Sequence, residues 1–194
     1  MNHEETSKGL PIAQLGQPVL RQKADPVTRE ELGSAELLEF IDQMVETLEI
    51  SGGVGLAAPQ VFKSKRIFLA AFERPDEEDK LELEVFINPV VTPMGEEKEL
   101  GWEGCLSFLE LYTYVPRYVS VRVDYLTPDG DESSLELTGF AARVVQHEND
   151  HLDGILTIDR APSTLDIVKT SEIEAVIESR RKNQKQKKQP LDNN

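Results

Sequence analysis

The stretch that decides the fold is QHENDH, residues 146–151, inside a predicted helix over residues 140–153. His147 and His151 are four residues apart, so a helix places both imidazoles on one face, one turn from each other. Both rings can therefore reach a single metal ion. Glu148 lies about 100° further around the helix, where its carboxylate can contact a water molecule on that ion without binding the ion itself.

The surroundings of this motif favour a metal site over a solvated polar helix face. Val144, Val145 and Leu152 are apolar, so at least one side of the helix is buried. The chain has 3 histidines, and two of them belong to the motif. Gly154 follows the predicted helix and is a suitable residue for its end. The pattern H-E-x-x-H is typical of zinc hydrolases.

The third metal ligand can come from either side of this motif. Catalytic sites of this kind commonly use three protein ligands and leave one position for water. No histidine follows the motif. The downstream ligand that is usual in zincin peptidases remains possible at Asp159, Glu172 or Glu174. Upstream, residues 103–107 (EGCLS) contain Cys105, the only cysteine. Its thiolate is the natural third ligand, although an isolated cysteine is commonly buried and inert.

A glycine-rich segment, GVGLAAPQ at residues 53–60, is the third element that could take part in binding or catalysis. Small residues allow the backbone to approach a ligand closely, and Gln60 offers a side-chain amide donor. The segment lacks the lysine of a phosphate-binding loop. A tight turn after a helix is the alternative interpretation.

Around these motifs the sequence predicts an α+β domain, with a mostly antiparallel sheet packed around the metal-binding helix. A first helix begins after Ser34, its N-cap, and ends at residues 51–53. An acidic loop is expected at residues 74–80. A C-terminal helix is expected after Ser163, and a flexible basic tail at residues 181–194 follows a single domain at residues 1–180. Strands are expected at residues 66–72, 83–91, 99–107 and 119–126, and around Leu135 and Leu137 after a turn at residues 127–130.

The composition indicates a protein with an acidic body. The chain has 194 residues, of which 39% are apolar, and a formal net charge of −15. No apolar run is long enough to span a membrane, and the first residues lack the features of a signal peptide. A single cysteine is typical of a reducing, cytoplasmic setting. The acidity argues against DNA binding, and we interpret it as a source of solubility more than as a docking surface.

Together and in this order, the three motifs resemble those of the peptide deformylase family. That family carries G-x-G-x-A-A-x-Q, E-G-C-x-S and Q-H-E-x-x-H, and residues 53–60, 103–107 and 146–151 match every fixed position. Asp150, Leu152 and Gly154 match the usual continuation of the third motif. The resemblance covers roughly residues 11–175.

The resemblance implies a metal-dependent hydrolase that removes the formyl group from the N-terminal formyl-methionine of nascent polypeptides. It implies that Cys105, His147 and His151 bind one divalent ion. Iron(II) is the implied native ion, with zinc, nickel or cobalt able to replace it, whereas the residues alone would have pointed to zinc. Metal-bound hydroxide is expected to attack the formyl carbon, with Glu148 as the general acid and base.

The resemblance also implies how the substrate is held. The side chain of Gln60 and the backbone N–H of Leu106 are expected to stabilise the oxyanion, a contribution of roughly 3 kcal/mol for one well-placed donor. Further residues are expected to supply backbone contacts and an apolar methionine pocket. They are Val54, Gly55, Glu103, Gly104, Phe140 and Val144. For Phe140 and Val144, core packing is an equal alternative.

The chain departs from the family pattern after Ser107. Phe108 stands where members have a short apolar residue before a proline, and Tyr112 stands in place of an arginine that is often found there. These positions flank the substrate groove in the family, so the preference for residues beyond methionine is left open. Tyr112 is either a wall of that groove or a surface aromatic residue.

Two other functions remain open at this point. A zincin-type metallopeptidase would need a ligand after His151 and would give no role to Cys105 or Gln60. A non-catalytic metal-binding paralogue would be indicated by the loss of Glu148 or Gln60, and both are present. The basic C-terminal residues allow a contact with ribosomal RNA, for which a disordered solubilising tail is the alternative.

Overall fold

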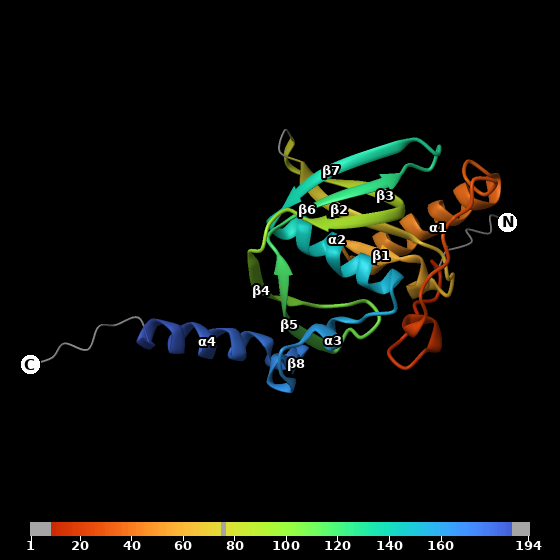
Figure 1. The fold of residues 1–194 in the computed structure, drawn as a ribbon. Helices are drawn as coiled ribbons and strands as arrows, with labels where there is room; N and C mark the ends of the chain where they lie inside the picture. The colour runs from red at the N-terminus through yellow and green to blue at the C-terminus, as the bar shows by residue number, and fades with distance from the viewer. Residues whose placement is uncertain (1–8, 75–76, 188–194) are drawn as a thin grey trace, which may run out of the picture.

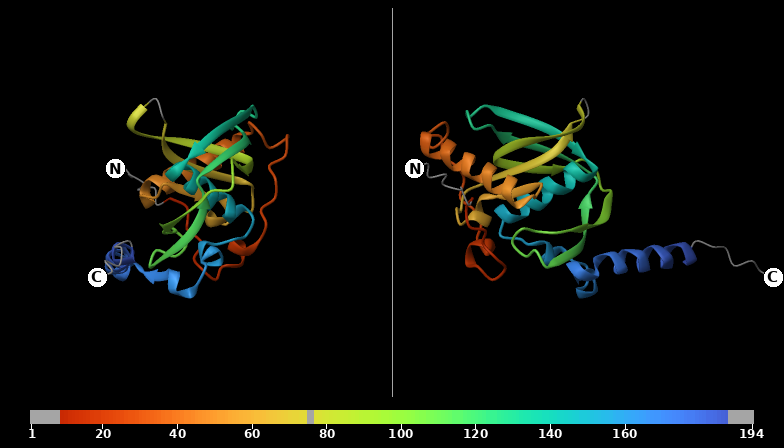
Figure 2. Two further views of the ribbon diagram at one scale, coloured as in Figure 1. Left: turned by 60° about the vertical axis from the view of Figure 1, so that its left-hand side comes forward. Right: turned by 180° about the vertical axis from the view of Figure 1, so that it is seen from behind.

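Two antiparallel sheets enclose a central helix in the computed structural model, which describes residues 9–74 and 77–187 (Figures 1 and 2). The larger sheet has the strand order β1-β2-β3-β6-β7, and the smaller one the order β4-β5-β8. The predicted α+β class with antiparallel sheets is confirmed.

The strands are β1 (Gly55–Ala57), β2 (Ile67–Arg74), β3 (Glu77–Pro93), β4 (Lys98–Glu103), β5 (Leu111–Tyr118), β6 (Ser120–Leu126), β7 (Glu132–Thr138) and β8 (Ile167–Lys169). The helices are α1 (Ala35–Ser51), α2 (Gly139–Leu152), α3 (Thr157–Arg160) and α4 (Ile173–Lys187).

Helix α1 covers one face of the larger sheet. Ser34 is its N-cap, as predicted, and its hydroxyl accepts a hydrogen bond from the N–H of Leu37 at 3.2 Å. Gly52 ends the helix in the left-handed conformation, with φ of 65°. Its apolar face packs against inward-pointing residues of β2 and β3. The residues of this cluster include Leu37, Ile41, Met44, Leu48, Ile67, Leu69 and Ile87.

Helix α2 lies against the opposite face of the same sheet (Figure 1). Because successive side chains of a strand point to opposite faces, Phe68 meets α2 while its neighbours Ile67 and Leu69 meet α1. This explains why β2 is apolar without alternation, as expected for a strand covered on both faces. The cluster on the α2 side includes Phe68, Phe86, Val121, Val123, Ala142, Val145 and Leu152.

Several predicted boundaries are wrong. Most of the expected acidic loop is strand, because β2 runs to Arg74 and β3 begins at Glu77; residues 75–76 lie outside the described residues. The strand expected at residues 99–107 ends at Glu103. β5 was not predicted, because its buried positions are Thr113, Val115 and Arg117 and only one of them is apolar.

The C-terminal helix begins later than predicted. After Ser163 the chain forms a 3-10 turn (Thr164–Asp166), the strand β8 and a second 3-10 turn (Thr170–Glu172) before α4. α4 extends away from the two sheets (Figures 1 and 2). It continues to Lys187, so the first residues of the predicted basic tail are helical, and residues 188–194 lie outside the described residues. Among the helices described, none is long and apolar enough to cross a membrane.

Candidate active site

Helix α2 and the turn after β4 bring the three predicted metal ligands together. The rings of His147 and His151 have centroids 5.1 Å apart. The sulfur of Cys105 lies 3.4 Å from Nε2 of His151. One ligand atom from each residue lies within 4.8 Å of the others, and all three residues are buried. Two imidazoles and one thiolate at this spacing fit a single divalent transition-metal ion.

Among residues 9–74 and 77–187, no carboxylate after His151 joins the group that could hold a metal ion. The carboxylate of Asp159 forms an ion pair with Arg21 and accepts a hydrogen bond from the N–H of Leu156 at 2.7 Å. Within the described residues, Cys105 is the third member of the group that could hold a metal ion. The position of the thiol therefore argues against the peptidase alternative.

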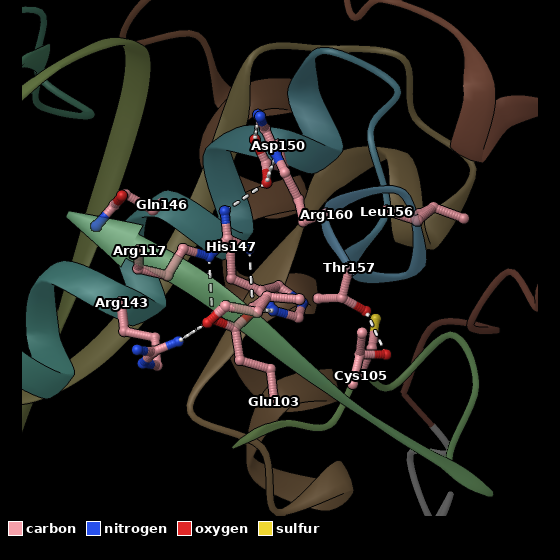
Figure 3. A network of polar contacts seen from close by, with 12 residues as sticks. Glu103, Cys105, Arg117, Arg143, Gln146, His147, Asp150, Leu156, Thr157 and Arg160 are labelled. Atoms are coloured by element: carbon pink, nitrogen blue, oxygen red, sulfur yellow. Dashed lines mark hydrogen bonds and ion pairs between the residues drawn. The ribbon is translucent and has the colours of Figure 1, made fainter. Parts of the chain in front are cut away.

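Behind the cluster, Glu103 orients one of the predicted metal ligands (Figure 3). One of its carboxylate oxygens, Oε2, lies 3.0 Å from Nδ1 of His147. The same carboxylate accepts two hydrogen bonds from Arg117, both at 3.0 Å, and one from Arg143 at 2.9 Å. Because an ionised carboxylate can only accept, Nδ1 of His147 carries the proton. In the neutral ring, the lone pair of Nε2 is then free for a metal ion.

Arg117 also connects this carboxylate to the next turn of α2. Its Nη1 donates to Oδ2 of Asp150 at 2.5 Å, and Arg160 donates to Oδ1 of Asp150 at 2.6 Å. Arg117, Glu103 and Asp150 are all buried. A buried charge is tolerated only when it is paired and hydrogen-bonded, and each of these three has such partners.

The pKa values follow from this arrangement. Burial would raise the pKa of Glu103, but hydrogen bonds from His147 and Arg117 outweigh it and lower the pKa to about 2. Burial holds the pKa of His151 well below its ordinary value, which keeps the ring neutral. Burial acts in the same direction on His147, but hydrogen bonds with Cys105 and Glu103 and the charge of Glu148 raise its pKa well above 6.5. The surroundings of His147 therefore favour a positive charge at this ring, and a divalent ion bound beside it would supply such a charge.

Glu148 is buried beside the ligands, as the helical spacing predicted. Burial raises the pKa of its carboxyl group to about 7. Its Oε2 is buried and has no hydrogen-bond partner among the described residues, which suits an atom that faces a water molecule. Gly55 makes room for it, because a Cβ at residue 55 would lie 2.3 Å from Oε1 of Glu148.

The side chain of Gln60 is fixed beside Cys105. It lies in a 3-10 turn, Ala58–Val61, and its side chain is 1% exposed. The N–H of Ala57 donates to its Oε1 at 2.8 Å, which directs the NH₂ group toward Cys105 Sγ, 3.6 Å away, and Ser107 Oγ, 3.2 Å away. An amide fixed in this way is a preorganised donor.

A cavity of about 440 Å³ opens in front of these groups. His151 lies behind the lining. Phe140 is 62% exposed, so core packing does not explain it, whereas Val144 lines the cavity and also belongs to the core. Tyr112 also lines the cavity, so it is a wall and not only a surface residue. The predicted residues that line it are Val54, Gly55, Gln60, Glu103, Gly104, Cys105, Leu106, Phe140, Val144, His147 and Glu148.

Some residues of the site were missed from the sequence. Trp102, Leu109, Arg143 and Thr170 also line the cavity, and Arg117 lies behind it. Thr113, Val115 and Arg117 alternate in the sequence, and this period of two could have revealed β5 and placed Arg117 on its buried face. No comparable signal in the sequence places Thr170 beside Leu109, because 61 residues separate them.

Comparisons with known proteins agree with these motifs. The family model described as polypeptide deformylase matches residues 10–166. "Peptide deformylase 2" of Nostoc sp. is 40% identical over 172 residues, which are 87% of this chain and 94% of the relative. "Peptide deformylase 2" of Pseudomonas putida is 45% identical over 149 residues, 75% of this chain and 83% of the relative.

Solved structures give the same result. A class I type b peptide deformylase from Acinetobacter baumannii, with Met-Ala-Ser bound, has a TM-score of 0.73 and 40% identity, covering 79% of this chain and 99% of that chain. The peptide deformylase from Thermotoga maritima has a TM-score of 0.71 and 39% identity, covering 80% of this chain and 99% of that chain.

Proposed function

This chain belongs to the polypeptide deformylase family, and we propose that its cavity removes the formyl group from formyl-methionine at the N-terminus of nascent polypeptides. The family is one of metal-dependent hydrolases. The observation that carries the proposal is the meeting of Cys105, His147 and His151 beside the buried carboxylate of Glu148.

The metal would be held by Sγ of Cys105 and one nitrogen of each histidine. When bound there, a divalent ion lowers the pKa of water and polarises the formyl oxygen. We propose iron(II) as the native ion, with zinc, nickel and cobalt able to replace it. A mixed set of one thiolate and two imidazoles supports this, because it accepts several first-row ions.

Glu148 is the proposed general acid and base. It accepts a proton from the attacking water and then delivers a proton to the leaving amine nitrogen. The new C–O bond forms first and leaves a negative charge on the formyl oxygen. The C–N bond of the formyl amide then breaks, so formate and a free N-terminus are released. The pKa of about 7 caused by burial supports both transfers near neutral pH, and a bound cation would favour the ionised form that begins the reaction.

Gln60 and Leu106 are the proposed oxyanion donors. The amide of Gln60 is fixed by Ala57, so little reorganisation is needed when charge develops on the formyl oxygen. Leu106 directly follows Cys105 and lines the same cavity, which supports a role for its backbone N–H.

The peptide is proposed to lie between the segments 54–55 and 103–104, with the methionine side chain against Phe140 and Val144. The carboxylate of Glu103 is already used by Arg117, Arg143 and His147. Only its backbone is therefore proposed to contact the substrate. The bound Met-Ala-Ser in the Acinetobacter baumannii relative supports an N-terminal methionyl peptide as the ligand of such a cavity.

We further propose a cytoplasmic location and a contact with the ribosome through basic C-terminal residues. Arg181 and Lys182 are exposed on α4, and further lysines follow at residues 185, 187 and 188. Such a contact would depend on salt, because neutralised phosphates release counterions. Co-sedimentation with ribosomes at low and high salt tests it, and binding that salt does not change would contradict it.

The decisive assay uses formyl-Met-Ala and unformylated Met-Ala-Ser, with iron supplied and oxygen excluded. We expect formate and free Met-Ala from the first peptide and no cleavage of the second. Cleavage of the second peptide would indicate a peptidase. The absence of formate release would reject the deformylase and leave the non-catalytic alternative.

A further inference from the structure

The match to the family model ends at residue 166, but the chain continues along one wall of the cavity. β8 pairs with β5 in antiparallel register, with Val168 opposite Tyr112. Tyr112 lines the cavity. The residues after 166 therefore complete the sheet that carries this wall.

The first contact from this C-terminal segment is made by Thr170. Its hydroxyl donates to the carbonyl oxygen of Leu109 at 2.8 Å, and its N–H donates to the carbonyl oxygen of Glu110 at 2.9 Å. Leu109 lines the cavity and is 65% exposed. The turn that presents this apolar side chain is thus held by two hydrogen bonds from the C-terminal segment.

The second contact is made by Arg180 on α4. Its guanidinium lies over the rings of Trp102 and Tyr114, 4.9 and 4.8 Å from their centroids. It also donates to Oδ1 of Asp166 at 2.8 Å and to the carbonyl oxygen of Leu165 at 3.1 Å. Trp102 lines the cavity. One side chain therefore joins the start of the segment, the helix and a cavity residue.

The catalytic groups are held by different contacts. Glu103 and Arg117 position His147, and Ala57 holds Gln60. Within the described residues, the hydrogen bonds and ring contacts of Thr170 and Arg180 reach none of the proposed metal ligands. Loosening the C-terminal segment should therefore alter peptide binding and leave the bond-breaking step unchanged.

We propose that residues 165–180 position the wall formed by Trp102, Leu109 and Tyr112, and that this wall holds the part of the peptide beyond the first two residues. Thr170 and Arg180 are positioning residues and touch no reacting atom. The inference rests on the proposed deformylase activity. It assigns a substrate-binding role to the part of the chain that lies beyond the family match.

The test compares a dipeptide, formyl-Met-Ala, with a tetrapeptide, formyl-Met-Ala-Ser-Leu, in the metal-loaded full chain. In Thr170→Val and Arg180→Ala, we expect KM for the tetrapeptide to rise about threefold, as for the loss of one exposed contact. We expect metal content to stay within error in both variants, and kcat and KM for the dipeptide to stay within error in Arg180→Ala, whose side chain does not line the cavity. Arg181→Ala and Ser171→Ala are matched controls, because they remove an exposed guanidinium and an exposed hydroxyl from neighbouring positions.

Thr170→Ser retains the hydroxyl and should restore the normal KM. If Arg180→Ala unfolds, the Val and Ser variants at residue 170 decide the matter, since Val replaces the surface hydroxyl of Thr170 with a methyl group and Ser keeps that hydroxyl. Unchanged KM for both peptides, or an equal loss of kcat on both, would overturn the positioning role. A wild-type chain without formate release would instead overturn the proposed function.

Discussion

The two sheets hold α2 by different means. The larger sheet meets the helix with apolar side chains, among them Phe68, Phe86 and Val123. The smaller sheet meets it with buried Glu103 and Arg117, which bond to His147 and Asp150. Apolar contacts are non-directional, whereas hydrogen-bonded ion pairs require particular geometry. The larger sheet therefore stabilises the helix without fixing a particular side-chain geometry, and the smaller sheet in addition orients the proposed metal ligand His147.

The largest effect should come from α2 itself, at Glu148. In Glu148→Gln the side chain keeps its size but can no longer accept the proton, so kcat should fall about a thousandfold. Metal content should not change, because Glu148 is not among the proposed ligands. Steady-state kinetics and elemental analysis measure the two quantities. Glu136→Gln, at an exposed position of β7, is the control. A loss of kcat of less than tenfold in Glu148→Gln would exclude Glu148 as the general acid and base.

Removing Arg117 should damage both the fold and the site. Arg117→Met leaves the buried carboxylates of Glu103 and Asp150 without a common partner, which should cost about 4 kcal/mol of unfolding free energy in urea. Arg122→Met is the matched control, because Arg122 and its partner Asp124 are 52% and 46% exposed, and an exposed ion pair contributes little to stability. Equal losses of unfolding free energy in both variants would show that burial of the network adds nothing to its contribution to stability.

On the apolar side, Leu152→Ala should destabilise without changing catalysis. Leu152 is 0% exposed in the cluster between α2 and the larger sheet, and its truncation should cost about 3 kcal/mol. In the folded fraction, kcat and KM should match those of the wild type. A large fall in kcat at a temperature where the variant is fully folded would contradict the division between the two sides.

The pH dependence of stability should identify Glu103. Its folded-state pKa, about 2, lies below the ordinary value of 4.5. Because the folded-state pKa is lowered, the stabilisation is fully present above pH 4.5 and is lost as the pH falls toward 2, a total of roughly 3 kcal/mol. Glu103→Gln should flatten this part of the curve in the metal-free protein. An unchanged slope of unfolding free energy against pH would assign the acid sensitivity to other carboxyl groups.

What could be predicted from the sequence follows the same division. The helical spacing of His147 and His151 and the N-cap at Ser34 are local patterns, and both were confirmed. The strands of the larger sheet have apolar residues at their buried positions, so hydropathy revealed most of them. β5 was missed because Thr113 and Arg117 are polar residues at buried positions.

The remaining errors have non-local causes. Residues 77–80 have the composition of a loop, yet they belong to β3, where Glu77 pairs with Arg74 of β2. β8 is three residues long and is stabilised by pairing with β5, about 56 residues earlier in the chain. Long-range pairing of this kind leaves no periodic signal in a short segment.

The ion pairs around α2 also have a mechanical consequence. His147 and Asp150 are three residues apart on the helix, and both connect to Arg117, one through Glu103 and the other directly. Two attachments on adjacent turns give the helix torsional stiffness, because rotation about its axis would stretch both. The orientation of the His147 ring is therefore set before an ion arrives. An ion that requires a different orientation of this ring must deform these ion pairs to obtain it.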